Sequence, residues 1–79
     1  MTMPRILLVE DDAILREEMA TWLEFEGYQV KAAACGQEGL QEAIDEKYDL
    51  VVSDIMMPDM DGLELLTELR RRPGTRLLP

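Results

Sequence analysis

Two short apolar runs, each followed closely by acidic residues, constrain the fold of this chain more than any other feature of its sequence. The first run covers residues 6–9 and is followed by Glu-Asp-Asp, and the second covers residues 50–52 and is followed by Ser53 and Asp54. Runs of this length without polar alternation are typical of strands that are buried on both faces of a parallel sheet. The pattern therefore favours an α/β fold in which helices cover both faces of the sheet.

Helical periodicity occupies much of the chain outside the two runs. Apolar residues recur at helical spacing over residues 13–26, with Asp12 placed as the N-cap and Gly27 as the C-terminal stop. A second helix is expected over residues 37–47, and a third is expected after a cap at Asp61. The apolar residues at helical spacing are Ile14, Leu15, Met19, Trp22 and Leu23 in the first helix and Leu63, Leu66 and Leu69 in the third, and Leu40, Ala43 and Ile44 of the second are expected to face inward.

Residues 28–33 alternate between apolar and polar side chains, as an exposed edge strand does. The order of the elements is then βαβαβα, and strands separated by helices form a parallel sheet through right-handed crossovers. We expect a flavodoxin-like, three-layer α/β/α fold with the strand order 2-1-3. In this order the first and third strands are neighbours, about 4.8 Å apart. Their carboxyl ends meet at the edge where open α/β sheets bind ligands.

Acidic residues are expected to converge at that edge, because Glu10 and Asp11 follow the first strand and Asp54 follows the third. Carboxylates this close repel one another, and a divalent cation removes the repulsion. The sequence has no histidine, and its single cysteine, Cys35, forms neither an internal disulfide nor a zinc site. Carboxylate oxygens without nitrogen or sulfur ligands favour Mg²⁺ or Mn²⁺.

The net charge of −9 argues against several classes of function. A chain this acidic repels phosphate backbones, so we expect no direct binding of nucleic acid by these residues. The apolar run at residues 6–9 is far too short for a signal peptide or a membrane span. We therefore expect a cytoplasmic protein without membrane contact, and a length of 79 residues limits it to one small domain.

The residues that follow the two buried strands resemble those of the receiver domain of two-component response regulators. The resemblance rests on Glu-Asp-Asp at residues 10–12 and on the run D-x-x-M-P-x-x-D-G at residues 54–62, which occur together at the expected separation. It extends over residues 1–79 and covers the N-terminal portion of a CheY-like receiver domain, without the fourth and fifth strands of that family.

This resemblance implies a role for each matching residue. Asp54 is expected to accept a phosphoryl group from the phosphohistidine of a sensor histidine kinase or a phosphotransfer protein. Asp11 is expected to bind Mg²⁺ directly, Glu10 mostly through water, and Met56 through its backbone carbonyl. Such a domain is a regulatory phosphoacceptor and not an enzyme, since it assists only its own phosphorylation.

The family resemblance also implies partners for the phosphoryl oxygens that this sequence does not match. Receivers of this kind use a Ser or Thr after the fourth strand and a Lys after the fifth, and no residue up to Pro79 corresponds to either. We therefore expect small phosphodonors to modify this chain poorly. The third strand has the sequence of a central strand but is an edge in a 2-1-3 sheet, so self-association through it is also expected.

Two other functions are compatible with parts of the pattern. The first is a truncated or engineered half of an α/β fold that dimerises as a scaffold without signalling activity. The second is a phosphohydrolase with an aspartate nucleophile. Phosphatases of the haloacid dehalogenase type require D-x-D, and Asp54-Ile55-Met56 lacks the second Asp, which disfavours this class.

Overall fold

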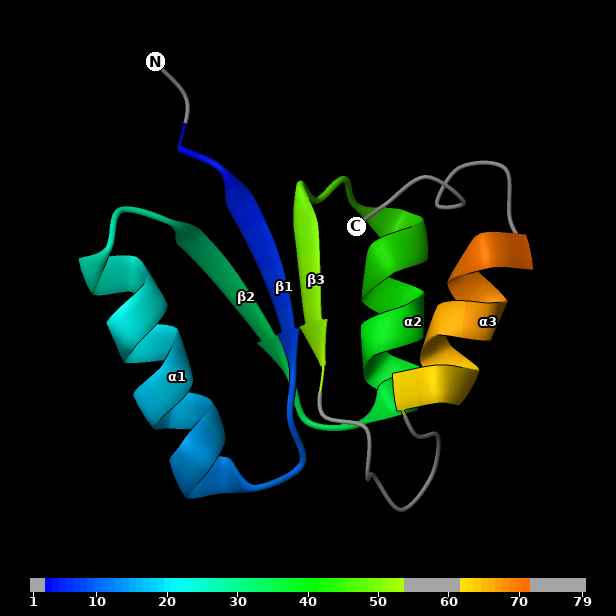
Figure 1. Cartoon of the computed structure of the whole chain (residues 1–79), viewed down its shortest axis with the longest axis horizontal. Helices are drawn as coiled ribbons and strands as arrows, with labels where there is room; N and C mark the ends of the chain where they lie inside the picture. Colours follow the sequence, from blue (N-terminus) through cyan, green and yellow to red (C-terminus); the bar gives the residue numbers. More distant parts are fainter. Residues whose placement is uncertain (1–2, 54–61, 72–79) are drawn as a thin grey trace.

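The computed structural model of the chain describes residues 3–53 and 62–71. The elements are β1 (Arg5–Val9), α1 (Ala13–Phe25), β2 (Gln29–Ala33), α2 (Gly36–Asp45), β3 (Leu50–Ser53) and α3 (Gly62–Arg71). The three strands form one parallel sheet in the order β2-β1-β3, with α1 on one face and α2 and α3 on the other (Figure 1). The predicted three-layer α/β/α architecture and the strand order 2-1-3 are confirmed.

β1 is the central strand and the most deeply buried part of the sheet. Its residues from Ile6 to Val9 are each at most 2% exposed. The parallel register places Val9 level with Ala33 of β2 and with Ser53 of β3. The carboxyl ends of all three strands therefore lie at one edge of the sheet.

The hydrophobic core lies between the sheet and the layer formed by α2 and α3. Its buried members are Leu7, Val9, Ala33, Leu40, Ala43, Tyr48, Leu65 and Leu69. Successive side chains of a strand point to opposite faces, so Ile6 and Leu8 of β1 face the α1 layer instead.

The ends of α1 follow the capping chemistry that the sequence predicts. Asp12 has an extended backbone, and its side chain accepts a hydrogen bond from the backbone N–H of Leu15 at 3.0 Å. After the helix, Gly27 has a φ of 100°, a left-handed conformation that glycine adopts without strain. Both predicted helix limits are confirmed to within one residue, because α1 ends at Phe25.

The apolar face of α1 packs less closely than its sequence predicts. No residue of α1 is buried, and Ile14 and Trp22 are 73% and 63% exposed. The helix rests on β1 and β2 through a narrow stripe that includes the half-buried Met19 and Leu23. Ile14, Leu15 and Trp22 belong to the apolar pattern of this helix but lie outside the core, because the three described strands are too narrow a surface to cover a wider stripe of the helix.

The inward face of α3 contains only some of its leucines. Leu65 and Leu69 are buried, whereas Leu63 and Leu66 are exposed. Residues four positions apart lie on one face of a helix, and in α3 this face packs against α2. Of the periodic leucines Leu63, Leu66 and Leu69, only Leu69 is buried.

The second helix covers Gly36–Asp45 and not residues 37–47. Leu40 and Ala43 are buried as predicted, but Ile44 is exposed because it follows Ala43 on the side of the helix that turns away from the sheet. At the free side of β3, Leu50 is 38% exposed, which agrees with the predicted position of β3 as an edge of the described sheet. Within residues 3–53 and 62–71, no helix has the length and apolar character needed to cross a membrane.

Candidate functional site

Glu10 is the first residue after β1 and lies at the carboxyl edge of the sheet. It is 4% exposed and is the one buried charged residue in the described part of the chain. Its backbone N–H donates a hydrogen bond to the carbonyl of Ala33 at 3.1 Å, which extends the β1–β2 pairing by one residue. Its carboxylate accepts a hydrogen bond from the backbone N–H of Asp12 at 3.3 Å. The fold therefore fixes the position of the Glu10 carboxylate, which is buried and hydrogen-bonded.

Asp11 and Asp12 divide two roles between them. The side chain of Asp12 is used as the N-cap of α1. Asp11 is exposed, and among the described residues no hydrogen-bond donor to its carboxylate is found. The carboxylate of Asp11 is therefore accessible to a ligand, and its role in binding Mg²⁺ stays a prediction.

Arg16 is a residue of this site that the sequence analysis misses. Its guanidinium Nη1 donates to the backbone carbonyl of Glu10 at 2.9 Å and lies 3.5 Å from that of Asp11. It reaches back from the first turn of α1 to the loop, and its side chain is half-buried. The available signal was a cation four positions after the Asp12 cap, on the helix that follows the acidic loop.

The end of β3 lies beside the end of β1, since Val9 is in register with Ser53. The next residue after Ser53 is the predicted phosphoacceptor Asp54. Asp54 and Met56, two of the four predicted site residues, lie outside the described residues, whereas Glu10 and Asp11 are described. Within the ranges that the structure describes, no three His, Cys, Asp or Glu residues form a group able to hold a metal ion. The four-residue metal site stays a prediction.

The donor chemistry at this edge can be compared with the needs of a divalent cation. Glu10 supplies a buried carboxylate and Asp11 an exposed one, on consecutive residues. Carboxylate oxygens are hard ligands, and Mg²⁺ typically binds through one or two protein carboxylates while keeping several waters. Glu10 and Asp11 thus have the ligand chemistry that such a partly hydrated cation takes.

α2 packs closely against the end of β1, on the face of the sheet opposite α1 (Figure 1). A Cβ atom placed on Gly39 would lie 2.5 Å from Cγ2 of Val9, the residue directly before Glu10. No side chain fits between these two elements without displacing one of them. The glycine thus lets α2 lie directly against the strand end that carries the acidic loop.

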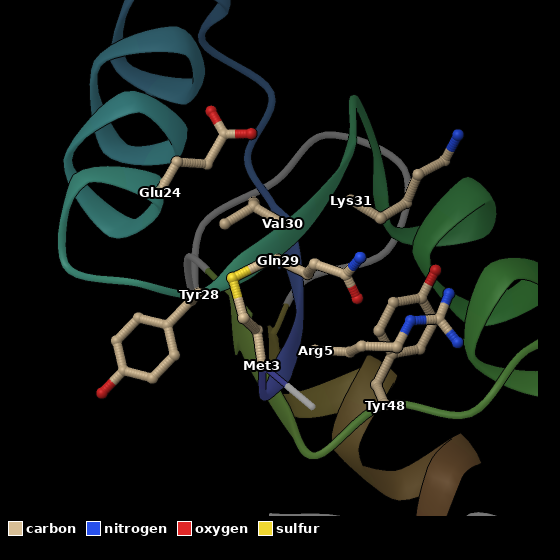
Figure 2. A pocket seen from close by; sticks show the side chains of 8 residues that line it. All are labelled: Met3, Arg5, Glu24, Tyr28, Gln29, Val30, Lys31 and Tyr48. Atoms are coloured by element: carbon tan, nitrogen blue, oxygen red, sulfur yellow. The ribbon is translucent and has the colours of Figure 1, made fainter. Parts of the chain in front are cut away.

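A hollow of about 520 Å³ lies at the opposite end of the sheet (Figure 2). It is lined by the first residues of β1 and β2 and by Tyr48, and Figure 2 shows the side chain of Tyr28 pointing away from the others. The guanidinium carbon of Arg5 lies 4.8 Å from the ring centroid of Tyr48, and Nη1 of Arg5 donates to the carbonyl of Lys47 at 2.9 Å. The hollow is separate from the predicted site, because it lies at the amino ends of the strands. Arg5, which lines it, is already used in these internal contacts.

Solved structures that share this fold include receiver domains. The chain superposes on the chemotaxis protein CheY4 of Vibrio cholerae with a TM-score of 0.93 and 32% identity, covering 99% of this chain and 65% of that chain. It also superposes on the receiver domain of a sensor histidine kinase from Pseudomonas aeruginosa, with a TM-score of 0.93, 29% identity and coverage of 99% of this chain and 64% of that chain. That second structure holds a magnesium ion in its active-site cleft.

The sequence itself matches the family model of the response regulator receiver domain over residues 6–78. Among curated proteins, the transcriptional activator protein PfeR of Pseudomonas aeruginosa is 45% identical over 75 residues, which cover 95% of this chain and 25% of PfeR. The chain therefore belongs to the response regulator receiver domain family of two-component systems. It spans about a quarter to a third of the length of the curated relatives that it matches.

Proposed function

We propose that this chain is the phosphoacceptor part of a response regulator, and that Asp54 accepts a phosphoryl group from the phosphohistidine of a sensor histidine kinase or phosphotransfer protein. The observation that carries the proposal is the parallel register of β1 and β3. It sets Val9 level with Ser53, so the described strand ends that precede Glu10 and Asp54 in the sequence lie at the same edge of the sheet. The family membership supports the same assignment.

In the proposed reaction only one group of the protein changes its covalent bonds, the side chain of Asp54. A carboxylate oxygen of Asp54 forms a bond to phosphorus while the bond between phosphorus and the donor imidazole nitrogen breaks, and the electron pair of that bond stays with the imidazole. No general base is needed, because an ionised carboxylate has no proton to remove before it attacks. The chain acts by orienting the nucleophile and by holding charge near the transferred group, and it functions as a regulatory domain without turnover.

Glu10, Asp11, Asp54 and the backbone carbonyl of Met56 are the proposed ligands of a Mg²⁺ or Mn²⁺ ion. When bound, the cation neutralises negative charge on the carboxylates and on the phosphoryl oxygens. Support comes from the buried position of Glu10, from the exposed carboxylate of Asp11 and from the magnesium ion in the related kinase receiver domain. We place the protein in the cytoplasm, with no direct role for these residues in binding nucleic acid.

Titration with Mg²⁺ tests the metal site without any phosphodonor. Weak, saturable binding is expected to shift the NMR signals of Glu10 and Asp11, and Asp11→Asn or Asp54→Asn is expected to abolish the shift. Asp12→Asn is the matched control, because it removes one charge from the same loop while asparagine still caps a helix. If the Asp12 variant loses binding and the Asp11 variant keeps it, the ligand assignment is wrong.

Mass spectrometry tests the phosphoacceptor. With acetyl phosphate and Mg²⁺, slow addition of one phosphoryl group is expected at Asp54, and both EDTA and Asp54→Asn are expected to prevent it. Modification at another residue, or modification that EDTA leaves unchanged, would contradict the proposal.

The alternative function, a scaffold that self-associates without signalling, is favoured by one specific observation. β3 is an edge of the described sheet, and Leu50 on that edge is exposed. Unpaired strand edges with apolar side chains tend to pair with other chains. A chain that associates but shows no cation-dependent modification would match this alternative.

A further inference from the structure

We propose that Arg16 is a positioning residue that holds the loop carrying the cation ligands. The inference rests on the proposed function, since it concerns how Glu10 and Asp11 are placed for the cation. Arg16 itself would touch neither the cation nor the phosphoryl group. It acts through the backbone of the two acidic residues.

The side chain of Arg16 contacts backbone carbonyls in the loop between β1 and α1. One guanidinium nitrogen donates to the carbonyl oxygen of Glu10 at 2.9 Å and reaches the carbonyl of the next residue, Asp11, at 3.5 Å. These two carbonyls lie between the last paired residue of β1 and the cap of α1, so neither belongs to the sheet ladder or to the helix. A charged donor that bridges consecutive carbonyls fixes the direction of the chain between them.

Other contacts hold the same loop as well, at its ends and, through the hydrogen bond from the Asp12 N–H to the Glu10 carboxylate at 3.3 Å, within it. The N–H of Glu10 is tied to Ala33 of β2, and the backbone N–H of Arg16 itself donates to the carbonyl of Asp12 at 2.8 Å in the first turn of α1. The Arg16 side chain therefore connects a helix end to the peptide groups from which both acidic side chains project. Groups that orient metal ligands in this way typically change metal affinity by about 10- to 100-fold when removed.

The sign of the expected effect separates positioning from simple charge. Arg16 carries a positive charge beside an acidic loop, so removing it lowers the electrostatic cost of bringing in a cation. If charge alone mattered, Arg16→Met would bind Mg²⁺ more tightly. If Arg16 positions the loop, the same variant binds Mg²⁺ more weakly although a repelling charge has been removed.

The experiment measures the dissociation constant for Mg²⁺ of the 79-residue chain and its variants by NMR titration, at a temperature where each variant is folded by circular dichroism. Arg16→Met is expected to raise the constant by about 10-fold or more. Arg16→Lys, which keeps the charge and one donor, is expected to recover part of the affinity. Arg71→Met is the matched control: it removes one arginine that contacts Glu68 on α3, and it is expected to leave the constant unchanged.

Each outcome decides something different. Weaker binding in Arg16→Met with partial recovery in Arg16→Lys supports the positioning role. Unchanged or tighter binding in Arg16→Met, with normal binding in the wild type, overturns that role and leaves the proposed function standing. No binding in the wild type overturns the proposed metal site, and the inference falls with it. Should Arg16→Met not fold, Arg16→Gln takes its place: it removes the charge and shortens the side chain, so unchanged or tighter binding of Mg²⁺ overturns the positioning role and weaker binding supports it.

Discussion

The side chain of Tyr48 lies in the core, and its hydroxyl group forms a hydrogen bond to a side chain outside the core. Its ring belongs to the buried cluster, while its Oη donates to the carboxylate of Glu42 at 2.6 Å. Burial of the phenol, followed by its hydrogen bond to Glu42, raises the pKa of Tyr48 well above the usual range of a tyrosine. The folded chain thus holds the phenolic proton more tightly than the unfolded chain does.

The raised pKa of Tyr48 fixes the direction of a pH effect. Its contribution to the free energy of unfolding is fully present below the pKa of an unfolded tyrosine, about 10, and is lost as the pH rises towards the higher pKa of the folded state. Tyr48→Phe is expected to lower the free energy of unfolding by about 1 kcal/mol at neutral pH. The difference from the wild type should shrink at pH values above about 10.

Urea unfolding at neutral and alkaline pH measures both effects. Tyr28→Phe is the matched control, because Tyr28 is more exposed and should show no comparable change. A difference between wild type and Tyr48→Phe that stays constant over the alkaline range would contradict the assigned cause.

Gly39 is a second residue whose effect is set by one contact. In Gly39→Ala the new methyl group would lie 2.5 Å from Cγ2 and 3.1 Å from Cγ1 of Val9, which is fully buried. We expect this overpacking to lower the free energy of unfolding by about 1–3 kcal/mol. Val9→Ala in the same chain should recover part of the loss, so a double-mutant cycle should show a favourable coupling between the two substitutions. Strictly additive effects would mean that the helix moves away without resistance.

The capping of α1 is the clearest case at the scale of an element. Asp12→Ala removes the hydrogen bond to the N–H of Leu15 and is expected to lower the free energy of unfolding by about 1 kcal/mol. Asp12→Asn should be close to the wild type, because the amide oxygen still accepts that bond. Thermal unfolding followed by far-UV circular dichroism distinguishes the two, and equal losses in both variants would show that charge, not capping, matters at this position.

Helix ends that depend on nearby residues are predicted correctly from the sequence. The burial of a helix face depends on residues far away in the chain, and it is not. The Asp12 cap and the Gly27 stop depend on neighbours within a few residues, and both are found. The exposure of Ile14 and the burial of Leu65 depend on how wide the sheet is and which helix packs beside α3, and a periodic pattern contains no information on either. The ring contact of Arg5 with Tyr48 joins residues 43 positions apart and was not foreseen.

The same limit applies to the candidate site. The acids that follow β1 are found because a buried strand that ends in carboxylates is a local pattern, and their shared edge with β3 follows from the strand order. Arg16 is missed because its hydrogen bonds are to backbone carbonyls, which every residue carries and which therefore leave no signal in side-chain composition. Asp54 and Met56 remain predictions from the motif.

At the scale of the whole molecule, the unpaired edge of β3 competes with the net charge. A charge of −9 opposes association, but repulsion is screened beyond about 8 Å at physiological salt, whereas strand pairing acts at contact. We expect the chain to associate at micromolar concentration, and to associate more strongly as salt is raised.

Analytical ultracentrifugation with two lysine variants tests this expectation. Leu50→Lys places a charge on the β3 edge and is expected to weaken association. Phe25→Lys adds the same charge to exposed α1, which packs against β1 and β2, and is expected to have a smaller effect. A wild-type chain that sediments as a monomer at every salt concentration, with protected amides at Val51 and Val52, would contradict the expectation.

The lack of any buried residue in α1 has a consequence for signalling that reaches beyond packing. Because so little of this helix is buried, we expect its free energy of local opening to be lower than that of α2 or α3. Arg16 of this helix donates a hydrogen bond to the acidic loop, so opening of α1 would release the loop as well. By thermodynamic linkage, a cation that binds only the ordered loop also holds α1 on the sheet. The occupancy of one small inorganic site would then control the folding of an entire surface layer of the molecule.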